Sequence, residues 1–321
     1  GLEVECHIFK VTVPNNSLSD CTQPATPPSI EALRHGYQYM SENTLDHLEP
    51  VINPIRQALI GAGLPLRILE AEWGPGQIEI SLDPLENIAA ADAMIVLRGA
   101  VKQVCRRMGL LASFMAKPAL PNVYSCGWHL HQSLFHTATG TNAFAEPGAL
   151  MSKTGLHFVG GLLAHARAAA AFSNPTITGY KRLNANPLAP NRVLWSIDNK
   201  GAMCRLVGGM GDPATHIENR SGEPAANPYL YMGSQIIAGL DGMANRVDPG
   251  EPLPDPYAQT QQPRMPGSLN EAVDELAAST VFREALGDEF IEHYLAVRRH
   301  EIGRFQSYVT DWEHREYFEA F

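Results

Sequence analysis

The chain has 321 residues, 45% of them hydrophobic and 18% charged, which is the composition of a globular protein with an ample core. Its net charge is −10 and no run of Lys and Arg is longer than a pair, which argues against a nucleic-acid or membrane-surface partner. The five cysteines are scattered without a C-x-x-C pair, which favours a reducing, cytoplasmic location over a disulfide framework or a zinc site.

Four segments alternate between apolar and polar side chains with the period of two that predicts β-strands. They are residues 1–10, 76–82, 128–134 and 214–220. Their polar faces carry, in chain order, Glu3, Glu5, His7, Glu79, His129, His131, His216, Glu218 and Arg220. Such a mixture repeated over several strands predicts a metal-and-phosphate site on one face of a sheet.

The remaining segments are predicted from apolar periodicity and from Pro and Gly positions. Helices are expected over 31–62, 83–108, 148–171 and 227–243, and C-terminal helices after a capping box of Ser268 and Glu271. Strands are expected over 67–72 and 111–117. Residues 11–30 and 247–267 are predicted to be loop or linker, and residues 174–192 to be irregular and functional.

The acidic side chains suggest which ion the site would hold. Glu3 and Glu5 lie two residues apart on one strand, so each could hold a different ion. The Gly74-Pro75-Gly76 turn can direct its two flanking glutamates toward one point. The six candidate ligands are Glu3, Glu5, Glu72, Glu79, His129 and Glu218. Each alone fits a solvated strand face or a structural role, but mostly oxygen ligands together favour Mg²⁺ or Mn²⁺ and phosphate chemistry.

Cations gather later in the chain, at Lys181, Arg182, Lys200, Arg205 and Arg220. Guanidinium groups suit the recognition of carboxylates and phosphates, so this acidic chain is expected to bind an anionic substrate, a nucleotide or both. The sequence contains neither a P-loop nor a Rossmann glycine fingerprint, so any nucleotide site is of another kind.

Six motifs in fixed order resemble the catalytic domain of the glutamine synthetase family over nearly the whole chain. They are Glu3-x-Glu5; Glu72-x-x-Pro-Gly-Gln-x-Glu79; Phe114-Met-Ala-Lys-Pro118; Gly127-x-His129-x-His131-Gln-Ser133; Asn174-Pro175 with Tyr180-Lys-Arg-Leu183; and Ile217-Glu-x-Arg220 with Asn227-Pro-Tyr-Leu230. The resemblance implies an α+β fold over residues 1–321, with a curved, mainly antiparallel sheet backed by helices. The chain starts with Gly inside a strand pattern, so we expect an N-terminal β-grasp-type domain to be absent from it.

The resemblance also implies an activity. ATP would phosphorylate the γ-carboxylate of glutamate, and an amine would then displace the phosphate to form a γ-glutamyl amide. Two or three Mg²⁺ or Mn²⁺ ions would assist, and the family assembles as two stacked hexamer rings with active sites between neighbouring subunits. A homo-oligomer, a dodecamer of this kind, is therefore expected.

Family roles carry over to matching positions. One metal would be held by Glu5, Glu72 and Glu79, and the second by Glu3, His129 and Glu218. His131 and Ser133 would lie against ATP, with His216 where an Arg near the phosphates is usual. The catalytic cations would be Lys200, Arg205 and Arg182. Lys200 and Arg205 would face the phosphate in transfer, and Arg182, together with Arg220, would hold the carboxylates of glutamate. Tyr124 and Ser125 replace an Asn-Gly pair that contacts glutamate.

Leu188 is the most informative departure, because glutamine synthetases have there a Glu that binds and deprotonates ammonium. A cationic amine needs a negative pocket and a base before it can attack, and leucine offers neither. An apolar surface suits an amine that is already neutral, such as an arylamine. The stretches 188–192 and 198–203 also resemble the branch that includes γ-glutamylanilide synthetases. A glutamine synthetase with its base elsewhere, a polyamine or alkylamine ligase, and a non-catalytic structural family member are the alternatives.

Overall fold

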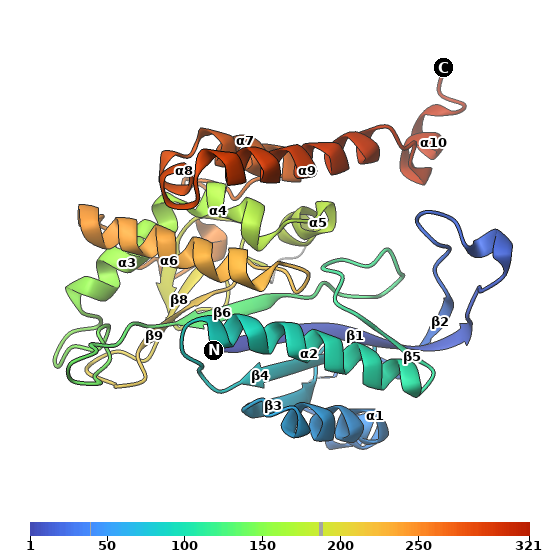
Figure 1. The fold of residues 1–321 in the computed structure, drawn as a ribbon, viewed down its shortest axis with the longest axis horizontal. Helices are drawn as coiled ribbons and strands as arrows, with labels where there is room; N and C mark the ends of the chain where they lie inside the picture. Colours follow the sequence, from blue (N-terminus) through green and yellow to red (C-terminus); the bar gives the residue numbers. More distant parts are fainter. Residues whose placement is uncertain (39, 186–188) are drawn as a thin grey trace.

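The computed structural model describes residues 1–38, 40–185 and 189–321. Within these ranges nine strands form one sheet in the order β3-β4-β1-β6-β9-β8-β7, with β2 and β5 pairing with β1 (Figure 1). All pairs are antiparallel except β7 with β8. The expected α+β class, with a mainly antiparallel sheet backed by helices, is confirmed.

The strand β1 (Leu2–Val13) organises the sheet because it pairs with four others. These are β2 (Ser29–Ala32), β4 (Gln77–Leu82), β5 (Leu110–Ser113) and β6 (Trp128–Gln132). The predicted alternation holds over the first half of β1, where Leu2, Val4 and Cys6 are buried and the glutamates between them face the other way. It does not extend further, because His7, expected on the polar face, is fully buried. A strand paired on both edges has a firmly fixed register.

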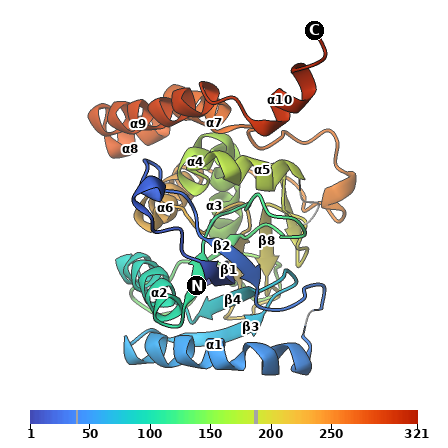
Figure 2. The ribbon, with the colours of Figure 1, turned by 90° about the vertical axis from the view of Figure 1, so that its right-hand side faces the viewer.

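The apolar face of this half of the sheet packs on two long helices. Side chains of β1, β4 and β6 share a core with α1 (Glu42–Gly61) and α2 (Ile88–Arg107), and β3 (Leu66–Ala71) completes this edge. Figure 2 shows α1 and β3 at one end of the molecule and the C-terminal helices at the other. The opposite, polar face of these strands is therefore left to carry the site.

A second core lies behind the strands β7 (Trp195–Ile197), β8 (Cys204–Val207) and β9 (His216–Asn219). Its helices are α3 (Lys153–Ala164), α4 (Ala166–Ser173), α5 (Ile177–Ala185), α6 (Pro228–Asn245), α7 (Leu269–Ala278), α8 (Thr280–Leu286) and α9 (Asp288–Gln306). The helix α10 (Asp311–Tyr317) extends from them, and two short 3₁₀ turns, Leu18–Asp20 and Pro256–Ala258, lie in connections (Figure 1). Among the described residues, no helix combines the length and apolarity needed to cross a bilayer.

Three predicted helices have different bounds. The helix expected over 31–62 begins at Glu42, and the loop expected over 11–30 is shorter, because β1 continues to Val13 and 29–32 form β2. The helix expected over 83–108 begins at Ile88, after Asn87 in the left-handed region with φ of 52°. The helix expected over 148–171 is two helices that meet at His165.

Other local predictions also need correction. Residues 174–192 are not wholly irregular, because α5 occupies 177–185 and the Pro residues of this stretch lie outside it. The strand expected over 111–117 ends at Ser113, whose hydroxyl accepts a hydrogen bond from the Met115 amide. The capping box is half formed: Ser268 accepts from the Glu271 amide, but the Glu271 carboxylate accepts from Gly267 instead.

The helices α3 and α6 approach so closely that glycine is required between them. A Cβ on Gly161 would lie 2.0 Å from the carbonyl oxygen of Ala238. We expect Gly161→Ala to lower the free energy of unfolding by about 2 kcal/mol, because two backbones must separate. Gly99→Ala in α2 is the control: its Cβ would meet nothing within 4 Å, so we expect a gain of about 0.5–1 kcal/mol from helix propensity. Equal effects of the two variants in urea unfolding would contradict this packing argument.

Candidate active site

Strand register brings the predicted side chains to one face of the sheet. Glu3 of β1 pairs with His129 of β6, and Glu5 of β1 pairs with Glu79 of β4. On the other side of β6, Glu218 of β9 lies opposite His131, and it also lies opposite Arg205 of β8. Five strands therefore contribute to a single polar cluster.

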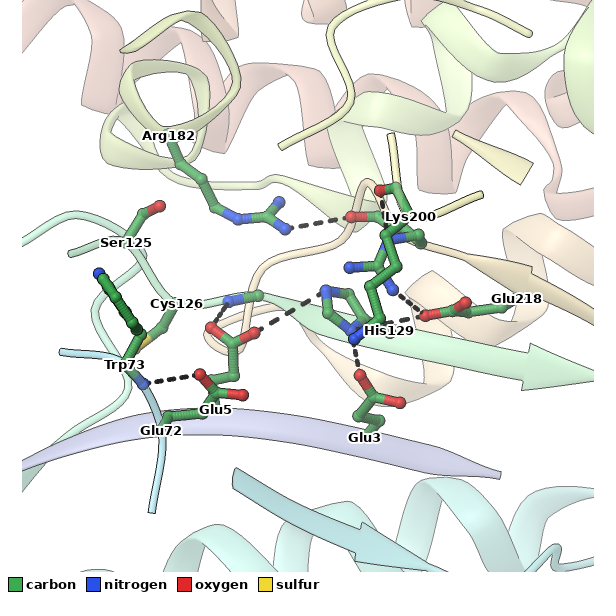
Figure 3. Close-up of polar contacts among 12 residues, drawn as sticks. Glu3, Glu5, Glu72, Trp73, Ser125, Cys126, His129, Arg182, Lys200 and Glu218 are labelled. Carbon is green, nitrogen blue, oxygen red and sulfur yellow. Dashed lines mark hydrogen bonds and ion pairs between the residues drawn. The ribbon is translucent and has the colours of Figure 1, made fainter. Parts of the chain in front are cut away.

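His129 is at the centre of this cluster (Figure 3). Its Nδ1 lies 2.5 Å from Oε1 of Glu3 and 3.6 Å from Oε1 of Glu218, and its Nε2 lies 3.9 Å from Oε1 of Glu5. Oε2 of Glu3 lies 3.1 Å from Nε2 of His131. Side chains far apart in the sequence thus meet around one imidazole.

Two groups of side chains are close enough to share an ion. In the described part of the chain, one ligand atom each of Glu3, Glu79 and His129 lie within 4.8 Å of one another, and so do those of Glu3, His131 and Glu218. These groups overlap with the predicted ligand sets but are not identical to them, since His131 was expected against ATP. The division of the ligands between two metals therefore stays a prediction.

The buried carboxylates destabilise one another in the absence of a cation. Burial raises the pKa of Glu5 to about 7, with a further rise from Glu72. Burial, followed by the charges of Glu3, Glu5 and Glu72, raises the pKa of Glu79 to about 10. Glu70, the cross-strand partner of Glu79, adds another carboxylate. Oxygen ligands whose charges repel across a buried face fit a divalent cation such as Mg²⁺ or Mn²⁺.

Glu3 and Glu218 behave differently because cationic or imidazole groups contact them. Burial opposes ionisation of Glu3, but hydrogen bonds from His129 and His131 outweigh it and lower the pKa of Glu3. Burial likewise opposes ionisation of Glu218, but the charges of His129 and Arg220 lower its pKa. These contacts therefore favour the ionised form of both carboxylates.

Cations occupy the β8–β9 end of the cluster. Nη1 of Arg205 donates to Oε2 of Glu218 at 3.0 Å, and Arg220 donates to the other oxygen of the same carboxylate. Nε of Arg220 also donates to the carbonyl of Lys200 at 2.9 Å. Figure 3 shows the Lys200 side chain pointing into the cluster. This end combines anion-binding groups with metal-type ligands, which is the combination that phosphate chemistry requires.

Arg182 lies above Glu5, fixed by the backbone around it. Its Nη1 donates to the carbonyl of Ser221 at 3.0 Å and its Nη2 to that of Arg220 at 3.1 Å. A Cβ on Gly127 would lie 2.5 Å from Nη2 of Arg182, so only glycine fits between this guanidinium and the cluster. The Gly127 amide donates to Oε2 of Glu5 at 2.9 Å.

Glu72 and Ser125 lie at the opposite end of the cluster from Glu218 (Figure 3), and Tyr124 directly precedes Ser125. Oε2 of Glu72 accepts from the amide of Trp73 at 2.8 Å. Nε2 of Gln77 donates both to Oε2 of Glu5 at 3.0 Å and to the Ser125 carbonyl at 3.1 Å, which ties this end together. The Tyr124 ring packs against another aromatic ring rather than against the carboxylates.

The other predicted residues are placed as follows. His216 of β9 lies 3.0 Å from His131, measured between Nε2 and Nδ1. Ser133 follows the last residue of β6. Leu188 lies outside the described residues. The structure therefore brings together every predicted metal ligand with His131, His216 and four of the five predicted cations, while Ser133 lies beyond the strand that carries His129. The prediction was wrong for Lys181, whose Nζ lies 5.6 Å from the centroid of the Phe305 ring.

The sequence interpretation missed four contributors: Glu70, Gln77, Gly127 as a spacer, and Asp198, which accepts from Arg205. Glu70 was detectable, because it shares the strand period of two with Glu72. The contact between Asp198 and Arg205 had no comparable signal, because it depends on how the 198–203 turn folds back.

Comparisons with known proteins agree with these motifs. A family model described as "Glutamine synthetase, catalytic domain" matches residues 1–317. A γ-glutamylanilide synthase of Acinetobacter sp is 41% identical over 99% of this chain and 67% of its own length. A glutamine synthetase of Methanosarcina mazei is 32% identical over 99% of the chain and 70% of its own length. A γ-glutamylethanolamide synthetase of Streptomyces coelicolor is 35% identical over 99% of the chain and 66% of its own length. The chain thus spans about two thirds of these relatives.

Glu79→Gln tests whether the carboxylate cluster is built for a cation. At pH 7 the native metal-free protein holds a proton on Glu79 that the unfolded chain releases, which costs stability. We expect the variant to be more stable than the wild type by about 1–3 kcal/mol at pH 7 without metal, with a difference that grows from about pH 5 toward pH 10. Its rise in Tm on adding Mg²⁺ should be largely lost, because a ligand charge is gone.

Calorimetry with EDTA and with Mg²⁺ measures both the stability of the metal-free protein and the rise in Tm on adding Mg²⁺. Glu31→Gln on exposed β2 is the matched control and should change neither, since its carboxylate is exposed and lies 4.0 Å from Lys10. An undiminished Mg²⁺ effect in Glu79→Gln would show that Glu79 holds no ion.

Proposed function

This chain belongs to the glutamine synthetase family of ATP-dependent glutamate–amine ligases, and we propose that it forms a γ-glutamyl amide from glutamate and an apolar or aromatic amine such as aniline. We propose that residues 1–321 are the catalytic domain, and that the whole protein also contains an N-terminal β-grasp-type domain. The reaction would pass through γ-glutamyl phosphate.

We propose the following roles for the residues of the cluster. Glu5, Glu72 and Glu79 would hold one Mg²⁺ or Mn²⁺ ion, and Glu3, His129 and Glu218 a second. Such ions neutralise phosphate charge and polarise the phosphoryl group when they are bound. His131, Ser133 and His216 would lie along the nucleotide.

The cations would stabilise the charges of the reacting groups. Lys200 and Arg205 lie at the Glu218 end of the cluster, where they would bind the phosphate in transfer. Arg182 and Arg220 would orient the carboxylates of glutamate. Arg182 is suited to this task because two backbone carbonyls fix its guanidinium beside Glu5. A fixed donor group needs little reorganisation when charge develops.

The proposal about the class of amine rests on the leucine at position 188. Leucine can neither attract an ammonium ion nor remove its proton, so an amine that is already neutral at pH 7 has the advantage. The similarity to a γ-glutamylanilide synthase, at 41% identity, supports the same class of amine. An amine such as ethanolamine is the second candidate, supported by the relative of that name at 35% identity.

We further propose a dodecamer of two stacked hexamer rings in the cytoplasm. The five cysteines are all free thiols, which suits a reducing compartment. Light scattering on the full-length protein measures the assembly.

A panel of amines tests the proposed function directly. Phosphate release by the full-length enzyme with ATP, Mg²⁺ and glutamate would be measured with ammonium, ethylamine, putrescine, ethanolamine and aniline. We expect aniline to give the highest kcat/KM. Leu188→Glu should raise kcat/KM for ammonium relative to aniline by about tenfold or more, because a carboxylate would bind and deprotonate the cation.

Leu188→Ile is the matched control, since it keeps an apolar side chain and should leave the ratio unchanged. A wild-type preference for ammonium would mean an ordinary glutamine synthetase. An unchanged ratio in Leu188→Glu would refute the role given to this position.

A further inference from the structure

Three aromatic rings meet beside the carboxylate cluster, and the predicted site residues include only one of them. Tyr37 lies between the other two, edge-on to Trp73 with centroids 6.1 Å apart and edge-on to Tyr124 with centroids 5.8 Å apart. The rings come from three segments distant in the sequence. They are called the aromatic cluster below.

The aromatic cluster is joined to the site through the backbone. Trp73 directly follows Glu72 and donates its amide to that carboxylate. Tyr124 directly precedes Ser125, whose carbonyl accepts from the Gln77 side chain that also holds Glu5. Figure 3 shows the Trp73 ring beside Glu72 and Ser125, at the opposite end of the site from Glu218.

Tyr37 is held in this position at a conformational cost. Its φ is +69°, in the left-handed region that bulky side chains rarely occupy. Its amide donates to the carbonyl of Trp73 at 2.7 Å, and its hydroxyl donates to the carbonyl of Asn122 at 3.2 Å. A Cβ on the preceding Gly36 would lie 2.7 Å from Pro75, so this segment is pressed onto the turn after Glu72. A strained residue fixed by its surroundings points to a functional constraint.

The rings are nevertheless accessible. Trp73 is 39% exposed and Tyr37 is 44% exposed, so their packing against each other leaves ring surface for a further partner. Aromatic side chains that are ordered but not buried at the edge of a charged site are suited to binding an apolar ligand.

The geometry of the reaction indicates which ligand this is. In the proposed function the phosphate is transferred at the end with Lys200 and Arg205, so the nucleotide occupies that end. The amine must therefore reach the acyl carbon from elsewhere, and the substituent on its nitrogen must point away from the nucleotide. Figure 3 shows Trp73 at the opposite end of the drawn cluster from Glu218, the carboxylate that Arg205 contacts.

We propose that Trp73, Tyr37 and Tyr124 bind the aromatic ring of an arylamine substrate and so determine the amine specificity of this enzyme. This inference rests on the proposed function and deepens it. The inferred ring-binding site does not depend on the residue at position 188. Its three aromatic side chains would attract the ring of the amine by stacking and edge-to-face contact.

The test compares two amines that are both neutral near pH 7 and of which only one carries a ring. Full-length wild-type and Trp73→Ala enzymes would be assayed with ATP, Mg²⁺, glutamate and either aniline or hydroxylamine, and the anilide and hydroxamate products quantified. We expect the KM for aniline in Trp73→Ala to rise about five- to tenfold relative to that for hydroxylamine, as the loss of an aromatic contact predicts.

Two further variants separate ring contact from folding. Trp73→Phe retains a ring and should keep most of the preference for aniline. Trp312→Ala removes an exposed Trp of α10, which lies away from β3 and β4 in both views, and should leave the ratio unchanged (Figures 1 and 2). Thermal unfolding checks that all variants are folded.

The outcomes are distinguishable. A wild-type enzyme that makes anilide, with no change of the KM ratio in Trp73→Ala, overturns this inference alone. An enzyme that makes hydroxamate but no anilide overturns the proposed class of amine and this inference with it. Formation of neither product overturns the ligase activity itself.

Discussion

The repulsion between carboxylates on one face of the sheet is the constraint on which the site depends. The pairings of β1 with β4 and β6 fix Glu5 opposite Glu79 and Glu3 opposite His129, so these side chains cannot separate without breaking the sheet. Burial denies them the screening of water. Such an arrangement persists only where cations or bound protons balance the charges, and the arginines that contact Glu218 supply part of that balance within the chain.

The same register controls stability and chemistry together. Since successive side chains of a strand alternate between faces, a slip of β1 by one residue would send its glutamates into the core with α1 and α2. The buried side chains Leu2, Val4 and Cys6 resist this slip. The apolar face therefore positions the polar one, and the precision of the site derives from core packing rather than from the site itself.

The fold and the site could be predicted from the sequence where the pattern lies within a short segment. Alternation identified the strands that carry the metal-type ligands, and ordered motifs identified the family. Prediction failed where long-range pairing decides the structure: residues 29–32 form a strand only because the far end of β1 lies beside them, and the short strands β7 and β8 have no pattern of their own. The contacts of Tyr37 likewise depend on a turn 36 residues away along the chain. The spacing of residues along the sequence cannot reveal such a long-range contact.

The proposed selectivity for a neutral amine follows from how charge would be used in this site. If Glu72 and Glu79 are committed to a divalent ion, as proposed, their charges no longer serve to attract an ammonium ion. The exposed ring surface of Trp73 and Tyr37 would then be available beside Glu72, and the residue at position 188 is a leucine rather than a glutamate. An amine would be selected there by the contacts of its substituent, whereas its nitrogen needs no base if it arrives unprotonated. In this proposal the family's charged contact to the amine is lost at Leu188 and aromatic contacts replace it, so the amine would change while the phosphate chemistry stays the same.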